Sequence, residues 1–597
     1  MATAPQTSTI KNNSHLAKPA SNHRAQKQKI LRQLQKLHGI SETDDDIVVT
    51  LDAKPCRLTE RFNVRGYAYA PDRTLLGVLI SRKVGGVLRR QLVKMAALRE
   101  PRKLAPVLEG LGLKTPLEPA GLKAIAKYIA AVAELSSVIV IGVEGLHWLG
   151  AGEERRPIAV LGDTVYGNGA EPVVPVLCGP SGYAAKGTLQ AWQQPFKRLA
   201  PGNPLLIFAL CFGLAPPLAT LTGLPMPGVL LCGLSSTDKI TLTHVIHSLF
   251  GPPRDPHQLP HTNISLEMLA ARARDLPLVL DELGARGGAD VLKAISRLGG
   301  GITKAGATAS GELREWQELR AAIFATGEVS VAQQARATGD TARAGHEAFL
   351  PTIRVGEHLG VYTDLHGAAD EAAFTADVSE AITNNFGVAY PAFVEQLIAK
   401  FAGAQEVVQR HWSSYETKVA GDIPLASMTE LERRVLAQFT VVALTGRLAV
   451  RLEILPLEAD APLAAVRHVF GQWLAGWRAR KEELHVAPLA TMRAFFKLQE
   501  PAVFVPFEDW EQHLGGSVYV KTHQPHGLLY LLRREYFENE LCREHGIEAT
   551  VKALQHAGLL VSDKRARTLL CRMPGRKDGE ADARTPFYAI KEAIRFD

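Results

Sequence analysis

Residues 228–250, GVLLCGLSSTDKITLTHVIHSLF, join an apolar run, a loop of glycine and hydroxyl residues, and a segment of helical period. The apolar run at 229–232 is bounded by glycines, which is typical of a short strand buried on both faces of a parallel sheet. From Lys239 onward apolar residues recur at helical spacing, and Gly251 followed by two prolines is a helix stop signal. Strand, loop and helix in this order predict a phosphate-binding loop.

This loop departs from the pattern G-x-x-x-x-G-K-[ST] at two positions. In a working loop, backbone N–H groups hold the phosphates, the lysine reaches the outer phosphates, and the last hydroxyl ligates magnesium. Asp238 replaces the second glycine, so we expect a carboxylate to face the phosphate position, and Ile240 replaces the hydroxyl. About 100° of helical rotation should turn the next hydroxyl away from the metal position. The candidate nucleotide-binding residues are Gly233, Ser235, Ser236, Thr237, Lys239 and Thr241.

Two later apolar runs agree with this loop. Residues 276–283, LPLVLDEL, lead into Asp281, which would hold magnesium, and Glu282, which would polarise the attacking water. Residues 321–328, AAIFATGE, end near Thr326, which is placed like a sensor beside the γ-phosphate. Each run alone is also compatible with an ordinary core strand. Their order and spacing favour an α/β fold, a P-loop NTPase core of the AAA+ kind.

The composition limits the classes of protein to which the chain can belong. At 597 residues the chain should form three or four domains. The net charge of +7 permits nucleic-acid contact without requiring it. The six cysteines are scattered, so they predict neither a disulfide framework nor a zinc site, and a reducing cytoplasm fits best. Residues 199–237 carry no charged side chain, which permits a membrane span, but internal prolines favour a buried core helix and no membrane.

The patterns along the chain divide it into five parts. We expect residues 1–44 to be a disordered basic leader, with a nucleic-acid arm or a partner helix as the alternative. Alternating strand patterns and a helix at 119–135 predict an α+β domain over 45–185 without a visible catalytic group. The P-loop core would occupy 186–358, a helical domain 359–525, and a winged-helix-like domain 526–597.

The last part carries the candidate DNA-binding residues. Its pattern of helices followed by two strands is the order of a winged helix, with residues 549–556 as the recognition helix. Basic side chains flank the expected wing and suit phosphate contact, although winged helices also serve as protein-interaction modules. These basic residues are Lys564, Arg565, Arg567 and Arg572.

An ordered set of motifs resembles the DUF927 family. The set runs from G-x-L-x-x-W at 187–192 through LAPGN, GLSSTDKIT, DLPLVLDEL and GGGITKAG to W-x-x-L-x-x-A-I-x-A-T-G-E at 316–328. Members of that family are bacterial proteins, many of them carried on mobile elements, with an AAA+-type core similar to replicative helicases. The resemblance covers most of the chain from residue 45 onward.

The resemblance implies ATP and Mg²⁺ as ligands, DNA as partner, assembly into a homo-oligomeric ring, and other replication proteins as further partners. It assigns the phosphate lysine to Lys239, the Walker B pair to Asp281 and Glu282, and a turn lysine to Lys304, with Thr326 and Glu328 at the end of the sensor strand. Family members often have an arginine where Phe349 stands, and such a trans-acting finger can be worth about 10³ to 10⁵ in rate. Arg343 or Arg354 would have to substitute for it.

Two functions remain open from the sequence. The first is a helicase-like AAA+ protein of a bacterial mobile genetic element that binds DNA and nucleotide and acts in DNA replication or translocation, with impaired hydrolysis. The second is a non-hydrolysing DNA- or protein-binding assembly factor that retains the AAA+ body. Asp238, Ile240 and Phe349 favour the second function. The intact Lys239 and Walker B pair support the first.

Overall fold

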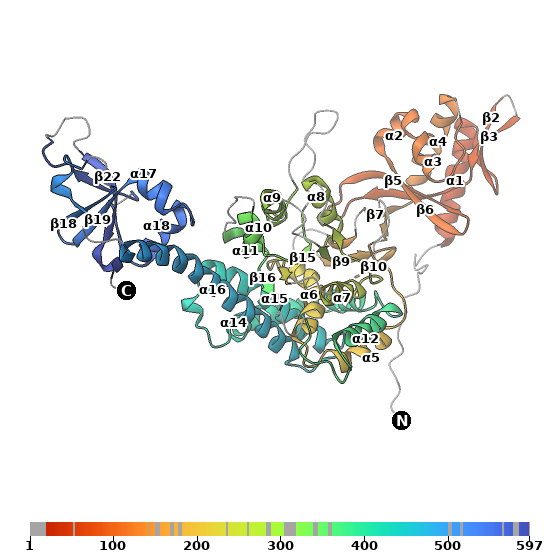
Figure 1. Ribbon diagram of the computed structural model, residues 1–597. Coiled ribbons are helices and arrows are strands. Elements are labelled where there is room, and N and C mark those ends of the chain that lie inside the picture. The colour runs from red at the N-terminus through yellow and green to blue at the C-terminus, as the bar shows by residue number, and fades with distance from the viewer. Residues whose placement is uncertain are drawn as a thin grey trace. The chain divides into compact units, whose positions relative to one another are not determined.

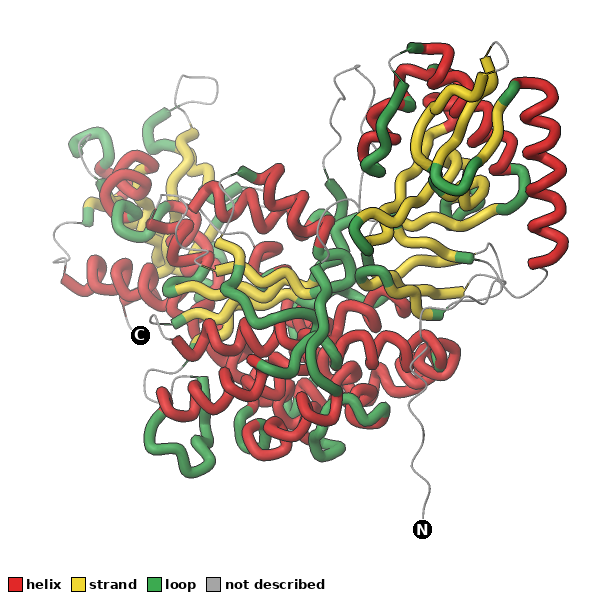
Figure 2. Tube along the Cα trace, turned by 90° about the vertical axis from the view of Figure 1, so that its right-hand side faces the viewer, coloured by secondary structure: helices red, strands yellow, loops and turns green. Residues whose placement is uncertain are grey.

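The structure is a computed structural model of the chain, which is divided into two compact units, residues 1–472 and 473–597 (Figure 1). Helices and strands are mixed in both units (Figure 2). The residues described are 20–51, 54–116, 118–142, 144–149, 156–167, 172–176, 182–233, 237–258, 262–281, 288–303, 318–337, 344–355, 361–498, 504–513, 517–563, 566–576 and 584–595.

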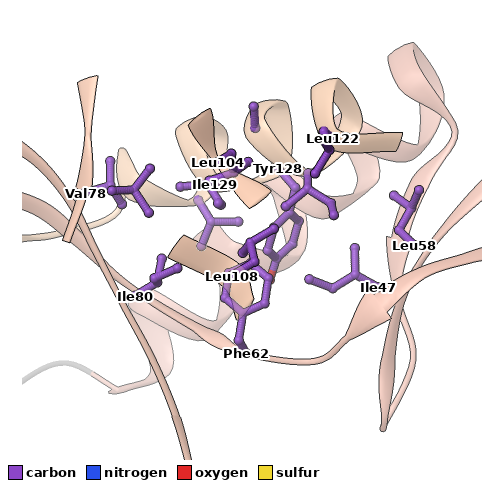
Figure 3. Packing of buried hydrophobic residues seen from close by; sticks show 14 of the residues in the cluster. Ile47, Leu58, Phe62, Val78, Ile80, Leu104, Leu108, Leu122, Tyr128 and Ile129 are labelled. Atoms are coloured by element: carbon purple, nitrogen blue, oxygen red, sulfur yellow. The ribbon is translucent and has the colours of Figure 1, made fainter. Parts of the chain in front are cut away.

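The first unit begins with an α+β body. Its main sheet has the strand order β11-β7-β4-β5-β6, with β4 at Asn63–Tyr69, β5 at Leu75–Val84, β6 at Val87–Lys94, β7 at Ser137–Ile141 and β11 at Val173–Pro175. A second sheet pairs β1 (Ile40–Glu42), β2 (Asp46–Leu51) and β3 (Lys54–Glu60). Helix α4 (Pro119–Ala133), predicted from its period, buries Leu122, Ile125 and Ile129 in the core that Figure 3 shows.

Helix α1 (Ala20–His38) differs from the expected disordered leader. Leu34 is buried, and Ile30 and Leu31 pack against the same core as α4. The backbone N–H of Gly39 ends the helix by donating to the carbonyl of Gln35 at 3.0 Å. The correction has a simple cause, because apolar residues at helical spacing bury one face of a helix even where its other positions are basic. Residues 1–19 lie outside the described residues.

The core sheet of the first unit is wholly parallel. Its strand order is β13-β14-β15-β12-β16, with β12 at Gly228–Cys232, β13 at His257–Gln258, β14 at Pro277–Asp281, β15 at Ala322–Gly327 and β16 at Thr352–Arg354. Every residue of β12 and β15 is buried, as their apolar runs predicted. The helices of this core are α7 (Thr237–Ser248), α8 (Asn263–Arg272), α9 (Gly288–Gly299), α10 (Val331–Ala337) and α11 (Ala344–Phe349).

A charge-free helix supports this sheet. Helix α6 (Pro204–Thr222) packs against α7 and α15 (Glu430–Arg451). Among the described residues it alone is long and apolar enough to cross a membrane, and 89% of its most apolar window is buried inside the protein. This burial agrees with the core helix expected over 199–237. The remaining helices of the unit include α5 (Leu189–Leu199), α12 (Glu371–Thr383), α13 (Ala389–Ala399) and α14 (Phe401–Ala420).

The second unit contains a six-stranded sheet. Its strand order is β17-β18-β19-β22-β20, and β21 also pairs with β22. Helix α18 (Ile547–His556) contains the expected recognition helix and buries Val551 and Leu554 against the sheet. Two strands of this sheet precede residue 526, where we expected the winged-helix-like domain to begin. The two strands expected after the helices therefore belong to a larger sheet. The strands are β17 (Val505–Pro506), β18 (Val518–His523), β19 (Gly527–Arg533), β20 (Leu560–Val561), β21 (Leu569–Arg572) and β22 (Arg584–Lys591).

Candidate functional site

The carboxyl ends of the core strands bring the predicted phosphate lysine beside the sensor strand. Lys239 lies in the first turn of α7 and is only 5% exposed. Its ammonium donates hydrogen bonds to the carbonyl of Gly233, which directly follows β12, at 2.5 Å and to that of Gly327, the last residue of β15, at 3.2 Å. Burial lowers the pKa of the Lys239 ammonium, and the nearby acidic groups of Cys232, Glu328 and Asp281 partly oppose this shift.

Asp281 and Thr326 meet at the same edge of the sheet. The hydroxyl of Thr326 donates a hydrogen bond to a carboxylate oxygen of Asp281. Thr326 is 1% exposed, whereas Asp281 is half-buried at the end of β14. The two meet because β14 and β15 are adjacent parallel strands whose carboxyl ends lie together. The hydrogen bond from Thr326 keeps the Asp281 carboxylate at this edge, where its charge also raises the pKa of Lys239.

Asp238 does not lie as its place in the loop motif predicted. Its carboxylate accepts a hydrogen bond of 2.6 Å from the hydroxyl of Thr375 in α12, and both side chains are 7% exposed. Asp238 is also absent from the residues of positive φ, so its backbone does not require glycine. The expectation that its carboxylate faces the phosphate position is therefore wrong, because a partner distant in sequence turns the carboxylate toward α12.

After Lys239, neither of the next two residues of α7 supplies a hydroxyl at the position where the loop motif binds magnesium. Ile240 is half-buried and contributes only a hydrocarbon side chain. Thr241 is 2% exposed, so its hydroxyl lies inside the fold. Within the described residues no group of three histidine, cysteine or acidic side chains could hold a metal ion. The described residues therefore fit a phosphate group, through Lys239, better than they fit a magnesium ion, for which Asp281 is the candidate ligand.

Arg354, a candidate for the finger arginine, and Phe349, where family members often have that arginine, have different surroundings. Arg354 ends β16 beside Cys232 of β12, and its side chain is exposed at the same sheet edge as Lys239. Phe349 instead packs against the apolar core under the sheet, so this position is structural.

Thr237 begins α7, but its side chain is not described. The predicted Ser235, Ser236, Glu282, Lys304 and Arg343 lie outside the described residues.

Comparison with protein families identifies the segment that builds much of this site. Residues 57–318 match the family model described as "Domain of unknown function (DUF927)". We call residues 57–318 the DUF927 segment. The DUF927 segment includes the loop strand β12, helix α7 and the strand that ends at Asp281. No curated protein matches the chain.

Comparison with solved structures extends the likeness beyond the DUF927 segment. The chain is similar to a structure described as "SCCmec type IV Cch - active helicase", with a TM-score of 0.64 and 17% identity over 93% of this chain and 97% of that chain. At this identity the likeness shows the fold alone. A full-length MCM homolog from Methanopyrus kandleri matches at a TM-score of 0.25 and 16% identity, covering 56% of this chain and 76% of that chain, which is too weak to compare folds.

A buried charged cluster around Asp275, which the sequence did not signal, lies beside the core sheet. Asp275 is fully buried just before β14. Its carboxylate accepts hydrogen bonds from the backbone N–H of Leu146 at 2.7 Å, the hydroxyl of Thr220 at 2.6 Å and the guanidinium of Arg320 at 2.9 Å. Burial raises the pKa of Asp275, and the nearby Arg320 charge and the hydrogen bonds oppose this shift.

Glycine is required where the N-terminal body meets this cluster. Gly145 has a φ of 109°, and a Cβ there would stand 2.6 Å from a carboxylate oxygen of Asp275. A cavity of about 750 Å³ lies beside the cluster, lined in part by His147, Arg274 and Arg320. It lies at the amino ends of the core strands, opposite the edge that holds Lys239, and is therefore separate from the candidate phosphate site.

Beyond the DUF927 segment, two of the predicted DNA-binding residues can be placed. Arg567 is exposed in the loop between β20 and β21. The pKa of Glu548 in α18 is lowered first by the hydrogen bond and charge of Lys552, and the Arg567 charge adds a smaller effect in the same direction. This effect places Arg567 near the first turn of α18. Arg572 ends β21 with its side chain exposed. Lys564 and Arg565 lie outside the described residues.

Proposed function

We propose that this chain is a helicase-like AAA+ protein of a bacterial mobile genetic element that binds DNA and nucleotide and acts in DNA replication or translocation, with impaired hydrolysis. The observation that carries the proposal is the convergence of Lys239 with the Asp281–Thr326 pair at neighbouring strand ends. A cation that can bind an outer phosphate and a carboxylate held by a sensor hydroxyl are the polar groups that phosphoryl transfer requires.

The strand order supports the same proposal. The sensor strand β15 lies between the loop strand β12 and the Walker B strand β14, so the three strands that carry the motifs end side by side at one edge of the sheet. The likeness to a solved structure described as an active helicase of an SCCmec element supports both the helicase-like body and the mobile-element setting. ATP, if bound, would supply an anionic phosphate chain, for which Lys239 would exchange its two carbonyl partners.

The expected impairment of hydrolysis rests on the metal side of the site. Ile240 offers no hydroxyl, so Mg²⁺ would lose a ligand that the loop motif normally supplies. Phe349 packs in the core instead of presenting a finger arginine. Arg354, exposed at the same edge of the sheet, is the described arginine best placed to act on a phosphate, with a neighbouring subunit's copy of Arg343 as the ring-based alternative.

The test is an ATPase and nucleotide-binding assay on the purified chain, with and without duplex or forked DNA. We expect ATP binding that Lys239→Ala abolishes and turnover well below that of an efficient motor. The matched control is Lys293→Ala, which removes an exposed lysine of α9. Binding that survives Lys239→Ala unchanged would contradict the proposed phosphate site.

The second function, a non-hydrolysing assembly factor, is favoured by the same departures at Ile240 and Phe349. Two measurements distinguish the helicase-like protein from the assembly factor: light scattering across protein concentration and the turnover assay. Assembly into a closed homo-oligomer without turnover, with DNA or another replication protein bound, would favour the assembly factor. A strict monomer in every condition would contradict the ring.

A further inference from the structure

Helix α1 carries a stripe of basic side chains on the face opposite to the one that packs against the core. Successive residues of an α-helix are rotated by about 100°, so Lys29, Arg32 and Lys36 fall within an arc of about 60°. All three side chains are exposed. The anchoring residues Ile30, Leu31 and Leu34 lie about 170° away around the helix.

The helix is held firmly at its base. Leu34 is 5% exposed in the core of the N-terminal body. Lys27 pairs with Glu42 of β1 at 2.8 Å, and the Lys127 ammonium of α4 lies 3.3 Å from the ring nitrogen of His38. These contacts fix both the position and the rotation of α1, so the stripe needs no ordering before it binds a partner.

Within the described ranges, no acidic side chain forms an ion pair with the stripe. The nineteen residues of α1 include no aspartate or glutamate. Lys29, Arg32 and Lys36 form no ion pair with any side chain in the described parts of the chain, whereas Lys27 is already paired. Three unpaired cations span about 10 Å along one helix face, and the amides of Gln28 and Gln33 flank them as further donors. This arrangement suits a row of phosphates.

We propose that this basic stripe, Lys29, Arg32 and Lys36, binds the phosphate backbone of duplex DNA without reading its sequence. A membrane surface fits less well, because an interfacial helix needs its apolar face free to enter the lipid, and here that face is buried in the protein core. Leu37, at 72% exposed, is the one large apolar side chain that α1 exposes among its described residues. The stripe lies in the body that includes the sheet of β4–β7, far along the chain from the expected C-terminal DNA-binding residues.

The experiment uses the full chain and measures affinity for two duplexes of unrelated sequence over a range of salt concentrations. The variant is Lys29→Gln with Arg32→Gln and Lys36→Gln, because glutamine keeps helix propensity while it removes the charge. The matched control is Lys54→Gln with Lys83→Gln and Lys94→Gln, which removes three exposed lysines from the strands of the same body. Both variants lower the net charge of +7 by three.

We expect the stripe variant to bind both duplexes more weakly, with a log-log salt slope reduced by roughly 0.9 for each phosphate that the stripe no longer neutralises. The control should keep the slope of the unchanged protein. Lys36→Gln alone should reduce the slope by one such step, which gives a graded result even if the triple variant folds less well. Circular dichroism melting curves check the fold of every variant.

Equal slopes for the stripe variant and the control would overturn the proposal. So would a stripe variant that loses binding to phosphatidylserine vesicles but not to DNA, since that result would identify a lipid surface. The measurement needs neither nucleotide nor turnover. A failure of the ATPase assay would therefore leave it unaffected, and a failure here would leave the phosphate site at Lys239 untouched.

Discussion

The hydroxyl of Thr375 donates to the carboxylate of Asp238 at 2.6 Å and thereby joins α12 to the first turn of α7. The residue that breaks the loop motif is thus part of the packing between two helices. A carboxylate near a helix N-terminus is also favoured by the partial positive charge there. Asp238 therefore stabilises the fold beside the loop, and its substitution cannot be treated as the simple removal of a repulsive charge.

The first prediction is that Asp238→Gly destabilises the protein. The change leaves the buried Thr375 hydroxyl without its acceptor, which costs about 1 to 3 kcal/mol in the free energy of unfolding. Urea unfolding measures this loss. Thr375→Val is the partner variant, and in a double-mutant cycle the two losses should not add. If the Asp238→Gly protein is as stable as the original and binds nucleotide more tightly, the prediction is wrong. That result would support the expectation from the motif that Asp238 repels the phosphates.

The second prediction concerns the missing hydroxyl at Ile240. Ile240→Thr should raise the affinity for ATP about tenfold or more in the presence of Mg²⁺ and leave it unchanged in EDTA, because the new hydroxyl completes the motif's metal ligand. Ile240→Val is the matched control, since valine has nearly the shape of threonine without its hydroxyl. Titration of a fluorescent ATP analogue measures both. Equal affinities for the threonine and valine variants would contradict the proposed metal position.

The third prediction is a pH dependence carried by Lys239. Burial lowers the pKa of this ammonium below that of an exposed lysine, whereas a phosphate bound beside it would raise the pKa again. Nucleotide affinity should therefore fall as pH rises through the lowered pKa, and binding above that pH should take up a proton. Calorimetry in two buffers of different ionisation enthalpy measures the uptake. Lys239→Met should remove it, and an unchanged uptake would assign it to another group.

The same shift has a consequence for stability. Because the pKa of Lys239 is lower in the folded chain, the unfolded chain binds more protons between the two pKa values, and the free energy of unfolding should rise with pH in that alkaline window. In Lys239→Met this rise should be absent. Urea unfolding at several alkaline pH values tests the sign independently of any nucleotide.

The fourth prediction concerns the C-terminal loop. The triple substitution Lys564→Ala, Arg565→Ala and Arg567→Ala should weaken binding to all DNA sequences about equally and lower the salt slope by roughly 0.9 per phosphate bound, because phosphate contacts carry no base readout. Arg534→Ala is the control, since Arg534 is exposed but already paired with Glu538 at 3.0 Å. Identical slopes for the triple variant and the original protein would instead indicate that this unit contacts protein.

Much of the core followed from local patterns in the sequence. The runs that became β12, β14 and β15 are buried strands of one parallel sheet, and carboxyl ends of such strands share an edge, so Asp281 and Thr326 could be expected to lie near each other. The helical period likewise located α4 and α7.

The parts that sequence patterns missed depend on partners distant along the chain. Asp238 is turned by Thr375, which lies 137 residues later, and no motif contains that information. At the position of α1 the basic composition favoured a disordered leader, with a helix only as the alternative, although three apolar residues were enough to anchor that helix in the core. Asp275 reads as a loop residue before an apolar run, and only the fold shows that it is fully buried beside Leu146.

The contact between Leu146 and Asp275 limits how the chain can be dissected. A shortened protein that starts after residue 185 would keep the Asp275 carboxylate and its Arg320 partner but lose the Leu146 N–H that binds the carboxylate at 2.7 Å and the Leu146 carbonyl that binds the guanidinium at 2.8 Å. Water would replace those partners at a position just before the strand that ends in Asp281. The residues before 186 thus cover the amino ends of the core strands. A fragment made without them would hold β14 less firmly.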